Sequence, residues 1–275
     1  MEYGIYDPVN AEFFLTHDTG LYSCMSVALW SICDLIAAGH LPSKVNFSGT
    51  LSAYKETAGE DTYPQMFESP SVSRLRDKLP AWTADRLKHF DHHGSYSALD
   101  FDVLSALVET YFKPNQQIHR QISDFSTQYL KNGQRYVGIC IRGTDKATEI
   151  APTDSSLYVE RAQKLLEEGL ADRVLIQTDQ AQICDLFKHH FSGICDVIEA
   201  LPRTSGQIVL HQTAEISGKR ISFAQNMTAA MYILSSMSHI VTHTGNIGAW
   251  ITLMRGTTRN VWQAGSRGIT LQSLA

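Results

Sequence analysis

The sequence predicts an α/β fold whose second half is a parallel sheet covered by helices on both faces. Two observations support this prediction. Patterns of buried strands alternate with amphipathic helical patterns through the second half, at the spacing of strand–helix–strand units. The first half is less regular and contains one long apolar helical stretch. We therefore expect two domains, 1–133 and 134–275, with the boundary at the turn that ends at Gly133.

Five segments of the second half have the composition of buried strands, because they are short, apolar and rich in β-branched residues. They are Tyr136–Ile141, Arg173–Gln177, Ile194–Glu199, His239–Thr242 and Asn260–Gln263. Between them lie four segments with apolar residues at helical spacing: Leu157–Gly169, Ala181–Phe191, Phe223–Met237 and Ile247–Arg255. This alternation predicts parallel strands joined by helical crossovers.

The first half is expected to hold fewer regular elements. A strand at Glu12–Thr16 precedes a long helix from about Cys24 to Ala38, which Gly39 stops. Two further helices are expected, at Val103–Phe112 and Ile118–Leu130. Residues 48–100 are rich in Gly, Pro, Ser, His and charged residues, so we expect loops and short helices there.

The composition is that of a globular protein, with 43% hydrophobic and 19% charged residues in a chain of 275. The net charge of −5 does not favour a nucleic-acid partner, because dedicated nucleic-acid binders carry a basic face. The five cysteines form no C-x-x-C pair, so we expect reduced thiols in a cytoplasmic protein. We expect no signal peptide and no membrane span, because the first residues lack a basic and an apolar region and no apolar stretch is long enough.

Two common nucleotide-binding motifs are absent. The sequence contains neither G-x-G-x-x-G, the fingerprint of dinucleotide sites, nor G-x-x-x-x-G-K-[ST], the phosphate loop of many NTPases. The remaining candidates lie at the carboxyl ends of the predicted strands, where open parallel sheets bind their ligands.

Polar residues follow three of these strands. They are Arg142-Gly143-Thr144-Asp145-Lys146 with Glu149 close behind, Thr178-Asp179, and Thr242-His243-Thr244-Gly245-Asn246 at the start of a predicted helix. The carboxyl ends of parallel strands meet at one edge of a sheet, so we expect a shared site. The planar fork of an arginine suits a phosphate, and backbone N–H groups at a helix start attract one. The three segments together predict a diphosphate site.

In this site residues 244–246 would cradle the diphosphate, Arg142 would clamp it from the side, and Asp179 would accept hydrogen bonds from a ribose or a base. Each of these residues also has an ordinary interpretation, because a Thr-Asp pair after a strand is often a helix cap. Glu199 and Arg203 either read the edge of the base or form a surface ion pair.

Two segments have features of metal sites, and we interpret both otherwise. Asp100-Phe101-Asp102 has a D-x-D pattern, but it follows no buried strand and leads into a helix, so its acids are expected in the first turn. Asp91-His92-His93 lacks the further ligands that a metal needs. We therefore expect no metal and no other cofactor.

At these strand ends the chain resembles the GT-B glycosyltransferases of the α1,6-fucosyltransferase and protein O-fucosyltransferase superfamily. The family signature, H-x-R-R-x-D-K or H-x-R, corresponds to Cys140–Lys146, read here as C-I-R-G-T-D-K. Ile176–Asp179 and Ile240–Asn246 match two further elements, and Gly20–Cys24 matches an N-terminal loop more loosely. The whole chain also resembles short glycosyltransferase-like proteins of large DNA viruses.

The resemblance implies a GT-B-like fold of two Rossmann-like domains, with an acceptor-side domain at 1–133 and a nucleotide-sugar-binding domain at 134–275. It implies an inverting, metal-independent transfer of a sugar from a nucleotide-sugar donor to a glycan or glycoprotein acceptor. The first donor expected is GDP-fucose, with UDP-xylose or another nucleotide-sugar as the alternative.

The resemblance also implies residue roles. Arg142 would bind the β-phosphate and stabilise the leaving diphosphate. Together with the strand-end reasoning, it gives these donor-binding candidates: Gly20, Ser23, Arg142, Thr144, Lys146, Thr178, Asp179, Glu199, Arg203, Thr244, Gly245 and Asn246. Asp145 or Glu149 would act as the catalytic base, ranked ahead of Asp18.

Two positions depart from the family pattern: Cys140 stands where the signature has histidine, and Gly143 where the α1,6 branch has its second arginine. These departures leave the sugar donor open. One alternative is a non-catalytic nucleotide-sugar or glycan binder, which would keep Arg142 and lack a working base. Another Rossmann-like enzyme, such as a methyltransferase, is disfavoured by the missing glycine-rich loop.

Overall fold

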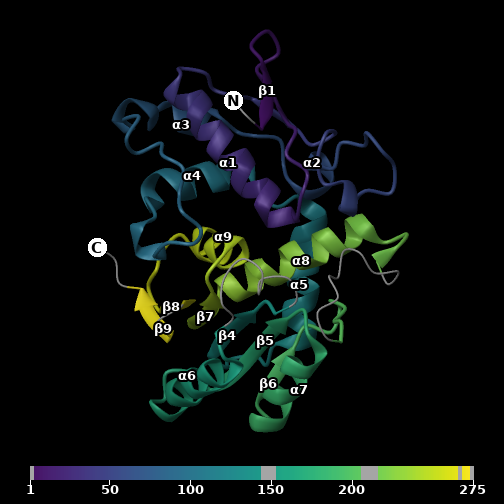
Figure 1. The fold of residues 1–275 in the computed structure, drawn as a ribbon, viewed down its shortest axis with the longest axis vertical. Coiled ribbons are helices and arrows are strands. Elements are labelled where there is room, and N and C mark those ends of the chain that lie inside the picture. Colours follow the sequence, from purple (N-terminus) through teal and green to yellow (C-terminus); the bar gives the residue numbers. More distant parts are fainter. Residues whose placement is uncertain (1–2, 144–152, 206–215, 266–267, 273–275) are drawn as a thin grey trace. The chain divides into compact units, whose positions relative to one another are not determined.

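The computed structural model describes residues 3–143, 153–205, 216–265 and 268–272 (Figure 1). The chain forms two compact units, each assembled from separate stretches. The first comprises Met1–Asp91, Leu99–His119 and Gly218–Gln225, and the second comprises His92–Ala98, Arg120–Ser217 and Asn226–Ala275. The units are not separated at a single point of the chain, because residues 92–98 and 120–133 belong to the second unit and residues 218–225 to the first.

The first unit contains one long helix and a small sheet. Helix α1 (Leu21–Ala37) is buried along most of its length, as its apolar sequence predicts. In the sheet, β2 (Glu12–Leu15) pairs with β1 (Gly4–Asp7) in antiparallel and with β3 (Lys44–Asn46) in parallel orientation. The other elements are η1 (Ser52–Tyr54), α2 (Tyr63–Met66), α3 (Ser73–Arg76), η2 (Leu79–Ala81) and α4 (Phe101–Tyr111).

The second unit is built on a six-stranded sheet of order β6-β5-β4-β7-β8-β9. Five strands are parallel and close to their predicted ranges: β4 (Tyr136–Ile141), β5 (Arg173–Thr178), β6 (Cys195–Val197), β7 (His239–His243) and β8 (Val261–Gly265). The sixth, β9 (Gly268–Gln272), was not expected and pairs with β8 in antiparallel orientation. The predicted α/β fold with a wound parallel sheet is thereby confirmed.

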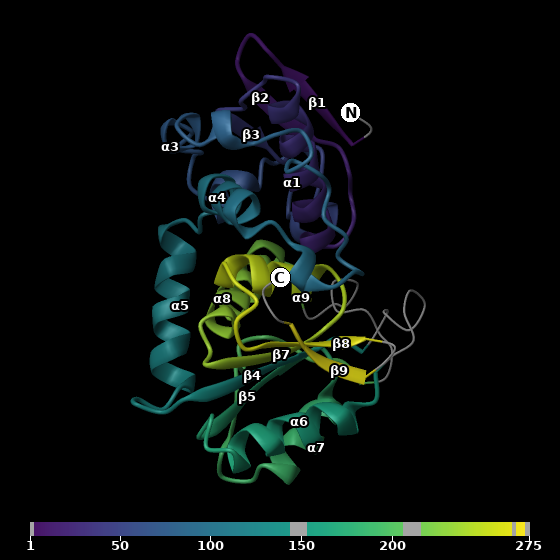
Figure 2. The ribbon, with the colours of Figure 1, turned by 90° about the vertical axis from the view of Figure 1, so that its left-hand side faces the viewer.

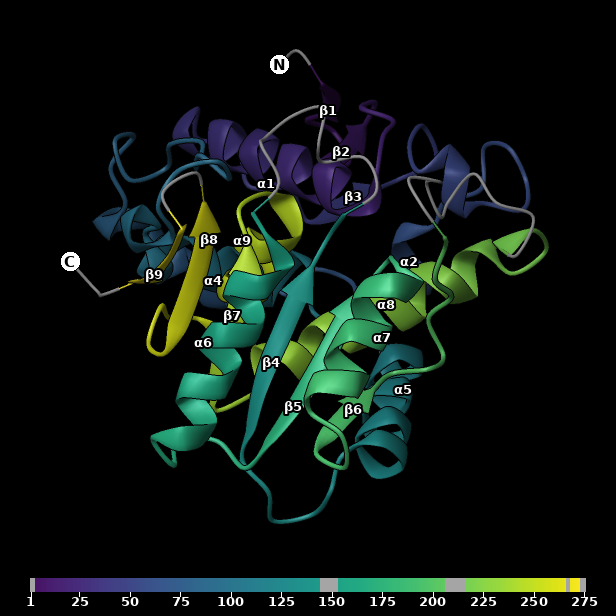
Figure 3. The same ribbon diagram turned by 60° about the horizontal axis from the view of Figure 1, so that its bottom comes forward.

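Helices cover both faces of this sheet (Figure 2). Helices α6 (Ser155–Glu167) and α7 (Ala181–His190) pack on one face, where their apolar residues join strand residues such as Ile139 and Ile176 in one core (Figure 3). On the other face lie α8 (Arg220–Ser235) and α9 (Asn246–Arg255). The remaining helices are α5 (Gln116–Tyr129) and η3 (Tyr96–Ala98).

The strand order reverses between β4 and β7. From β4 the chain adds β5 and β6 on one side, and it then returns to add β7 and β8 on the other side. A crevice opens beyond the carboxyl ends of two parallel strands at such a reversal, because their connections leave in opposite directions. The ends of β4 and β7 are therefore the place to look for a ligand site.

Within the described ranges, no helix is both long and apolar enough to cross a membrane.

Candidate functional site

The first part of the candidate site is the turn after β4. Arg142 is partly exposed and directly follows the buried strand that ends at Ile141. The next residue, Gly143, donates its backbone N–H to Oδ1 of Asp179 at 3.0 Å. Asp179 follows β5, so its carboxylate connects the ends of two neighbouring strands and fixes the turn that carries Arg142.

The segment after β5 is itself held by backbone bonds. Thr204 donates its N–H to the carbonyl of Asp179 at 2.9 Å, and its own carbonyl accepts the N–H of Ala181 at 3.0 Å. The hydroxyl of Thr178 accepts the N–H of Gln180 at 3.2 Å, as in other hydroxyl-stabilised turns. Thr178 thus shapes the turn, and Asp179 presents its carboxylate towards β4.

The second part is the start of α9, which follows β7 after a short turn. Gly245 is the N-cap residue, with φ of 140°, a backbone conformation that favours glycine. The N–H of Thr244 bonds to the carbonyl of Ala264 at 3.0 Å, and the N–H of Gly245 bonds to the Tyr96 hydroxyl at 3.0 Å. These two amides of the predicted cradle therefore have protein acceptors. Asn246, the third residue of the cradle, is the first residue of α9.

The first helical bond of α9 runs from Ala249 N–H to the carbonyl of Gly245. As at any helix start, the amides that precede it have no carbonyl of the same helix to bond to, and the N-cap residue Gly245 supplies no side-chain cap. The helix can begin this close to β7 because Gly248 has no side chain. A Cβ there would lie 2.2 Å from the His243 carbonyl oxygen.

A polar row crosses the sheet just below these turns. Gln177, Cys140, Thr242 and Gln263 are register neighbours on four adjacent strands, and all four are buried. Burial raises the pKa of the Cys140 thiol to about 12, and nearby Asp179 acts in the same direction. Cys140, which stands where the similar signature has histidine, is therefore a neutral, buried thiol that cannot supply positive charge to a phosphate.

Two residues of this region were not predicted from the sequence: Tyr96 and Gln263. The side-chain amide of Gln263 accepts the N–H of Tyr96 at 3.0 Å, and it donates to the Gly94 carbonyl at 2.8 Å and to Thr244 Oγ1 at 3.0 Å. A glutamine inside a buried strand was the available signal, because such a side chain needs partners.

Glu199 and Arg203 are candidates for contacts with the base of the nucleotide. They form an ion pair with 2.9 Å between Oε2 and Nη1. Lys188 lies 2.7 Å from the other carboxylate oxygen, and Arg203 also donates to the Ile198 carbonyl. Burial alone would raise the pKa of Glu199, but the hydrogen bond from Lys188 and the charge of Arg203 outweigh it and lower that pKa.

The remaining candidates of the first unit lie around the start of α1. Asp18 accepts the N–H of Ser52 at 2.9 Å, and Ser23 Oγ lies 3.3 Å from His17 Nε2. Gly20 is the N-cap of α1, and a Cβ at this position would meet no atom within 4 Å. Thr144, Asp145, Lys146 and Glu149 lie outside the described residues.

The acids of the D-x-D segment have the predicted role. Asp100 caps α4 and accepts the N–H of Val103, and Arg86 bonds to both Asp100 and Asp102. In the part of the chain that the structure describes, no group of three or more His, Cys, Asp or Glu side chains is placed to hold a metal ion.

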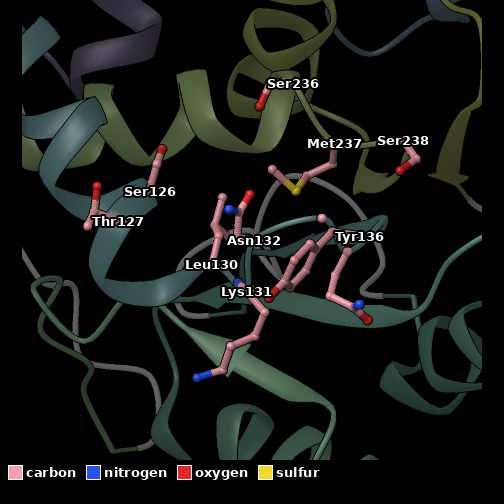
Figure 4. A pocket seen from close by; sticks show the side chains of 11 residues that line it. Ser126, Thr127, Leu130, Lys131, Asn132, Tyr136, Ser236, Met237 and Ser238 are labelled. Atoms are coloured by element: carbon pink, nitrogen blue, oxygen red, sulfur yellow. Dashed lines mark hydrogen bonds between the residues drawn. The ribbon is translucent and has the colours of Figure 1, made fainter.

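A surface pocket of about 500 Å³ lies at the opposite edge of the sheet. Its lining includes Ser126 and Thr127 on α5, Tyr136 at the start of β4, and Met237 after α8 (Figure 4). Because it adjoins the amino end of β4, this pocket is separate from the candidate site at the carboxyl ends.

No family model matches the chain, and no curated protein matches it by sequence. The fold is nevertheless shared with solved fucosyltransferase structures of the GT-B type. It is similar to NodZ α1,6-fucosyltransferase co-crystallised with GDP, with a TM-score of 0.52 and 14% identity over 92% of this chain and 95% of that chain. NodZ soaked with GDP-fucose gives a TM-score of 0.54 and 14% identity over 92% and 96% of the two chains. The Bradyrhizobium NodZ structure gives 0.52 and 12% over 92% and 95%.

Proposed function

We propose that this chain is an inverting, metal-independent glycosyltransferase that transfers a sugar from a nucleotide-sugar to a glycan acceptor. The observation that carries the proposal is that Arg142 and the start of α9 follow the neighbouring strands β4 and β7, where the strand order reverses. Cys140 and Thr242 are register neighbours, so Arg142 and Thr244 each lie two residues beyond that pair and directly follow β4 and β7. A diphosphate bound there would meet a guanidinium fork and helix N–H groups together.

The donor proposed first is GDP-fucose. Its support is the fold shared with NodZ structures that were co-crystallised with GDP or soaked with GDP-fucose. UDP-xylose or another nucleotide-sugar is the alternative, because Cys140 and Gly143 depart from the family pattern. Arg142 would stabilise the charge that develops on the departing diphosphate, the function that a metal serves in other transferases.

The proposed donor contacts in the second unit are Arg142, Thr144, Lys146, Thr178, Asp179, Glu199, Arg203, Gly245 and Asn246. Thr244 would help to position the turn before α9 and would not donate to the ligand, since its N–H and hydroxyl both bond to the Ala264 carbonyl. Asp145 and Glu149 remain the first candidates for the base. The roles of Asp18, Gly20 and Ser23 in the first unit also stay predictions.

A binding screen followed by a transfer assay tests this proposal. A ligand that binds only the native state raises the melting temperature. We expect GDP and GDP-fucose to do so, and S-adenosylmethionine to have no effect. With the donor that binds, Arg142→Ala should lower kcat/KM by about 100-fold or more, the cost of losing one stabilising group in a transfer reaction.

The matched control is Arg135→Ala. Arg135 lies directly before β4, whereas Arg142 lies directly after it, and Arg135 forms an exposed ion pair with Asp172. This control should leave kcat/KM near the wild-type value. Near-normal transfer by Arg142→Ala would refute the mechanism. Donor binding without transfer or donor hydrolysis would instead identify a non-catalytic nucleotide-sugar binder.

A further inference from the structure

A short segment of the chain reaches the candidate site although its sequence neighbours pack elsewhere. Residues His92–Ala98 belong to the second unit, whereas the residues on either side of them belong to the first. Polar side chains hold the segment to the last two strands. Gln263 binds Gly94 and Tyr96, and Gln272 binds Ser95 and Ser97.

The centre of this segment is Tyr96, which is completely buried. Its hydroxyl lies 3.0 Å from three backbone atoms: the carbonyl oxygens of His243 and Gly245, and the nitrogen of Gly245. The hydroxyl accepts the N–H of Gly245 and has one proton to donate to either carbonyl. Burial raises the pKa of Tyr96 far above its ordinary value, so the donor proton stays in place at neutral pH.

This arrangement differs from an ordinary helix cap. Most helices begin with a Ser, Thr, Asp or Asn whose side chain accepts an N–H of the first turn. The N-cap of α9 is Gly245, which has no side chain, and Tyr96, 149 residues away in the chain, instead bonds to the N–H and the carbonyl of this N-cap residue. The bond uses the Gly245 N–H, and the first-turn amides of α9 follow directly after it at the carboxyl edge of the sheet.

We propose that Tyr96 is the positioning residue of the diphosphate site: its hydroxyl holds the Gly245 peptide, and so it orients the first-turn N–H groups of α9 towards the phosphates. That the ligand is a diphosphate rests on the proposed function. The orientation of the helix start does not, and it can be measured without any ligand.

The test compares Tyr96→Phe with Tyr111→Phe. Tyr111 is an equally buried tyrosine of the first unit, and its hydroxyl donates to the Pro42 carbonyl at 2.8 Å. Each variant thus loses one buried hydroxyl bonded to backbone. Only Tyr96→Phe should speed hydrogen exchange of the amides at 245–248 in the ligand-free protein, by about tenfold for one lost buried bond.

The second readout is the ratio of GDP to GMP affinity, which isolates the contribution of the second phosphate. Tyr96→Phe should lower this ratio by about fivefold to tenfold, and Tyr111→Phe should leave it unchanged. A purely structural role would lower the melting temperature of both variants without changing the ratio. If Tyr96→Phe does not fold, Gln263→Met, which releases the segment from β8, should change both readouts in the same direction.

Unchanged exchange at 245–248, or an equal change in the two tyrosine variants, overturns the inference. So does faster exchange with an unchanged GDP to GMP ratio. If the wild-type protein binds no nucleoside diphosphate, the proposed function fails, and the exchange experiment then decides by itself whether Tyr96 orders the start of α9.

Discussion

The carboxylate of Asp179 accepts the backbone N–H of Gly143 across 3.0 Å, and this bond joins the turns that follow β5 and β4. Arg142 directly precedes Gly143, so the direction of its side chain depends on a turn that Asp179 holds. In this structure Asp179 therefore acts on Arg142 through the backbone, in addition to any contact with a bound nucleotide.

Two substitutions of Asp179 separate its hydrogen bond to Gly143 from the effect of its negative charge. Asp179→Ala removes the acceptor and should weaken GDP binding by about tenfold, the usual effect of leaving one N–H without its partner. Asp179→Asn keeps an acceptor oxygen in place and should retain most of the affinity. Calorimetric titration of both variants measures the difference. Equal losses would show that the charge matters more than the bond.

The side chain of Gln180 fills the space that a side chain at position 143 would need. The effects of substitutions at these two positions on stability should therefore be coupled. A Cβ at position 143, where the family pattern has its second arginine, would lie 2.1 Å from Oε1 of Gln180. Because Oε1 is the end of a flexible side chain that can move aside, Gly143→Ala should destabilise the protein by no more than about 1 kcal/mol. In the Gly143→Ala, Gln180→Ala double variant, the loss in the free energy of unfolding, measured with urea, should be smaller than the sum of the two single losses by at least about 0.5 kcal/mol. Simple additivity would contradict this prediction.

Gly248→Ala tests the approach of α9 to β7. Alanine is favoured over glycine in a helix by about 1 kcal/mol, yet the new Cβ would lie 2.2 Å from a backbone oxygen and 2.5 Å from the Tyr96 hydroxyl. We expect a net loss of about 1–3 kcal/mol in the free energy of unfolding. Gly20→Ala is the control, because its Cβ meets no atom within 4 Å. A stability loss of the same size in both variants would refute the packing argument.

Much of the second unit could be predicted because its strands are buried on both faces. Continuous apolar runs such as Val137–Ile141 have few other interpretations, and their order along the chain determines where ligands bind in such sheets. Two edge strands, β1 and β9, were missed for the opposite reason. Strand β1 has four residues, and Ile5 is 63% exposed, so its sequence carries no pattern of burial.

The details of the candidate site depend on contacts that no local pattern reveals. The prediction that residues 244–246 form a cradle took their N–H groups to be available to a ligand. The structure bonds the N–H of Gly245 to Tyr96, which lies in a segment that reads as an irregular loop. Likewise, Gln180 fills the space beside Gly143 although nothing in the sequence connects the two positions.

The pH dependence of stability should include a contribution from His239 at the start of β7. Its side chain is 8% exposed, and burial lowers its pKa, with the positive charges of Arg255 and Arg135 acting in the same direction against the opposing charge of Glu168. The unfolded chain, with an ordinary histidine pKa of about 6.5, therefore takes up a proton at a higher pH than the folded protein does. Stability from this residue is complete above about pH 6.5 and declines as the pH falls below that value.

His239→Gln isolates this contribution, since glutamine does not titrate in this range. Urea unfolding at pH 7.5, 6.5 and 5.5 should show a smaller loss of stability on acidification in the variant than in the wild type. Because other groups titrate in both proteins, the informative quantity is the difference between the two slopes. Parallel slopes would mean that His239 has the same proton affinity in the folded and unfolded chains, and a steeper slope in the variant would reverse the sign of the argument.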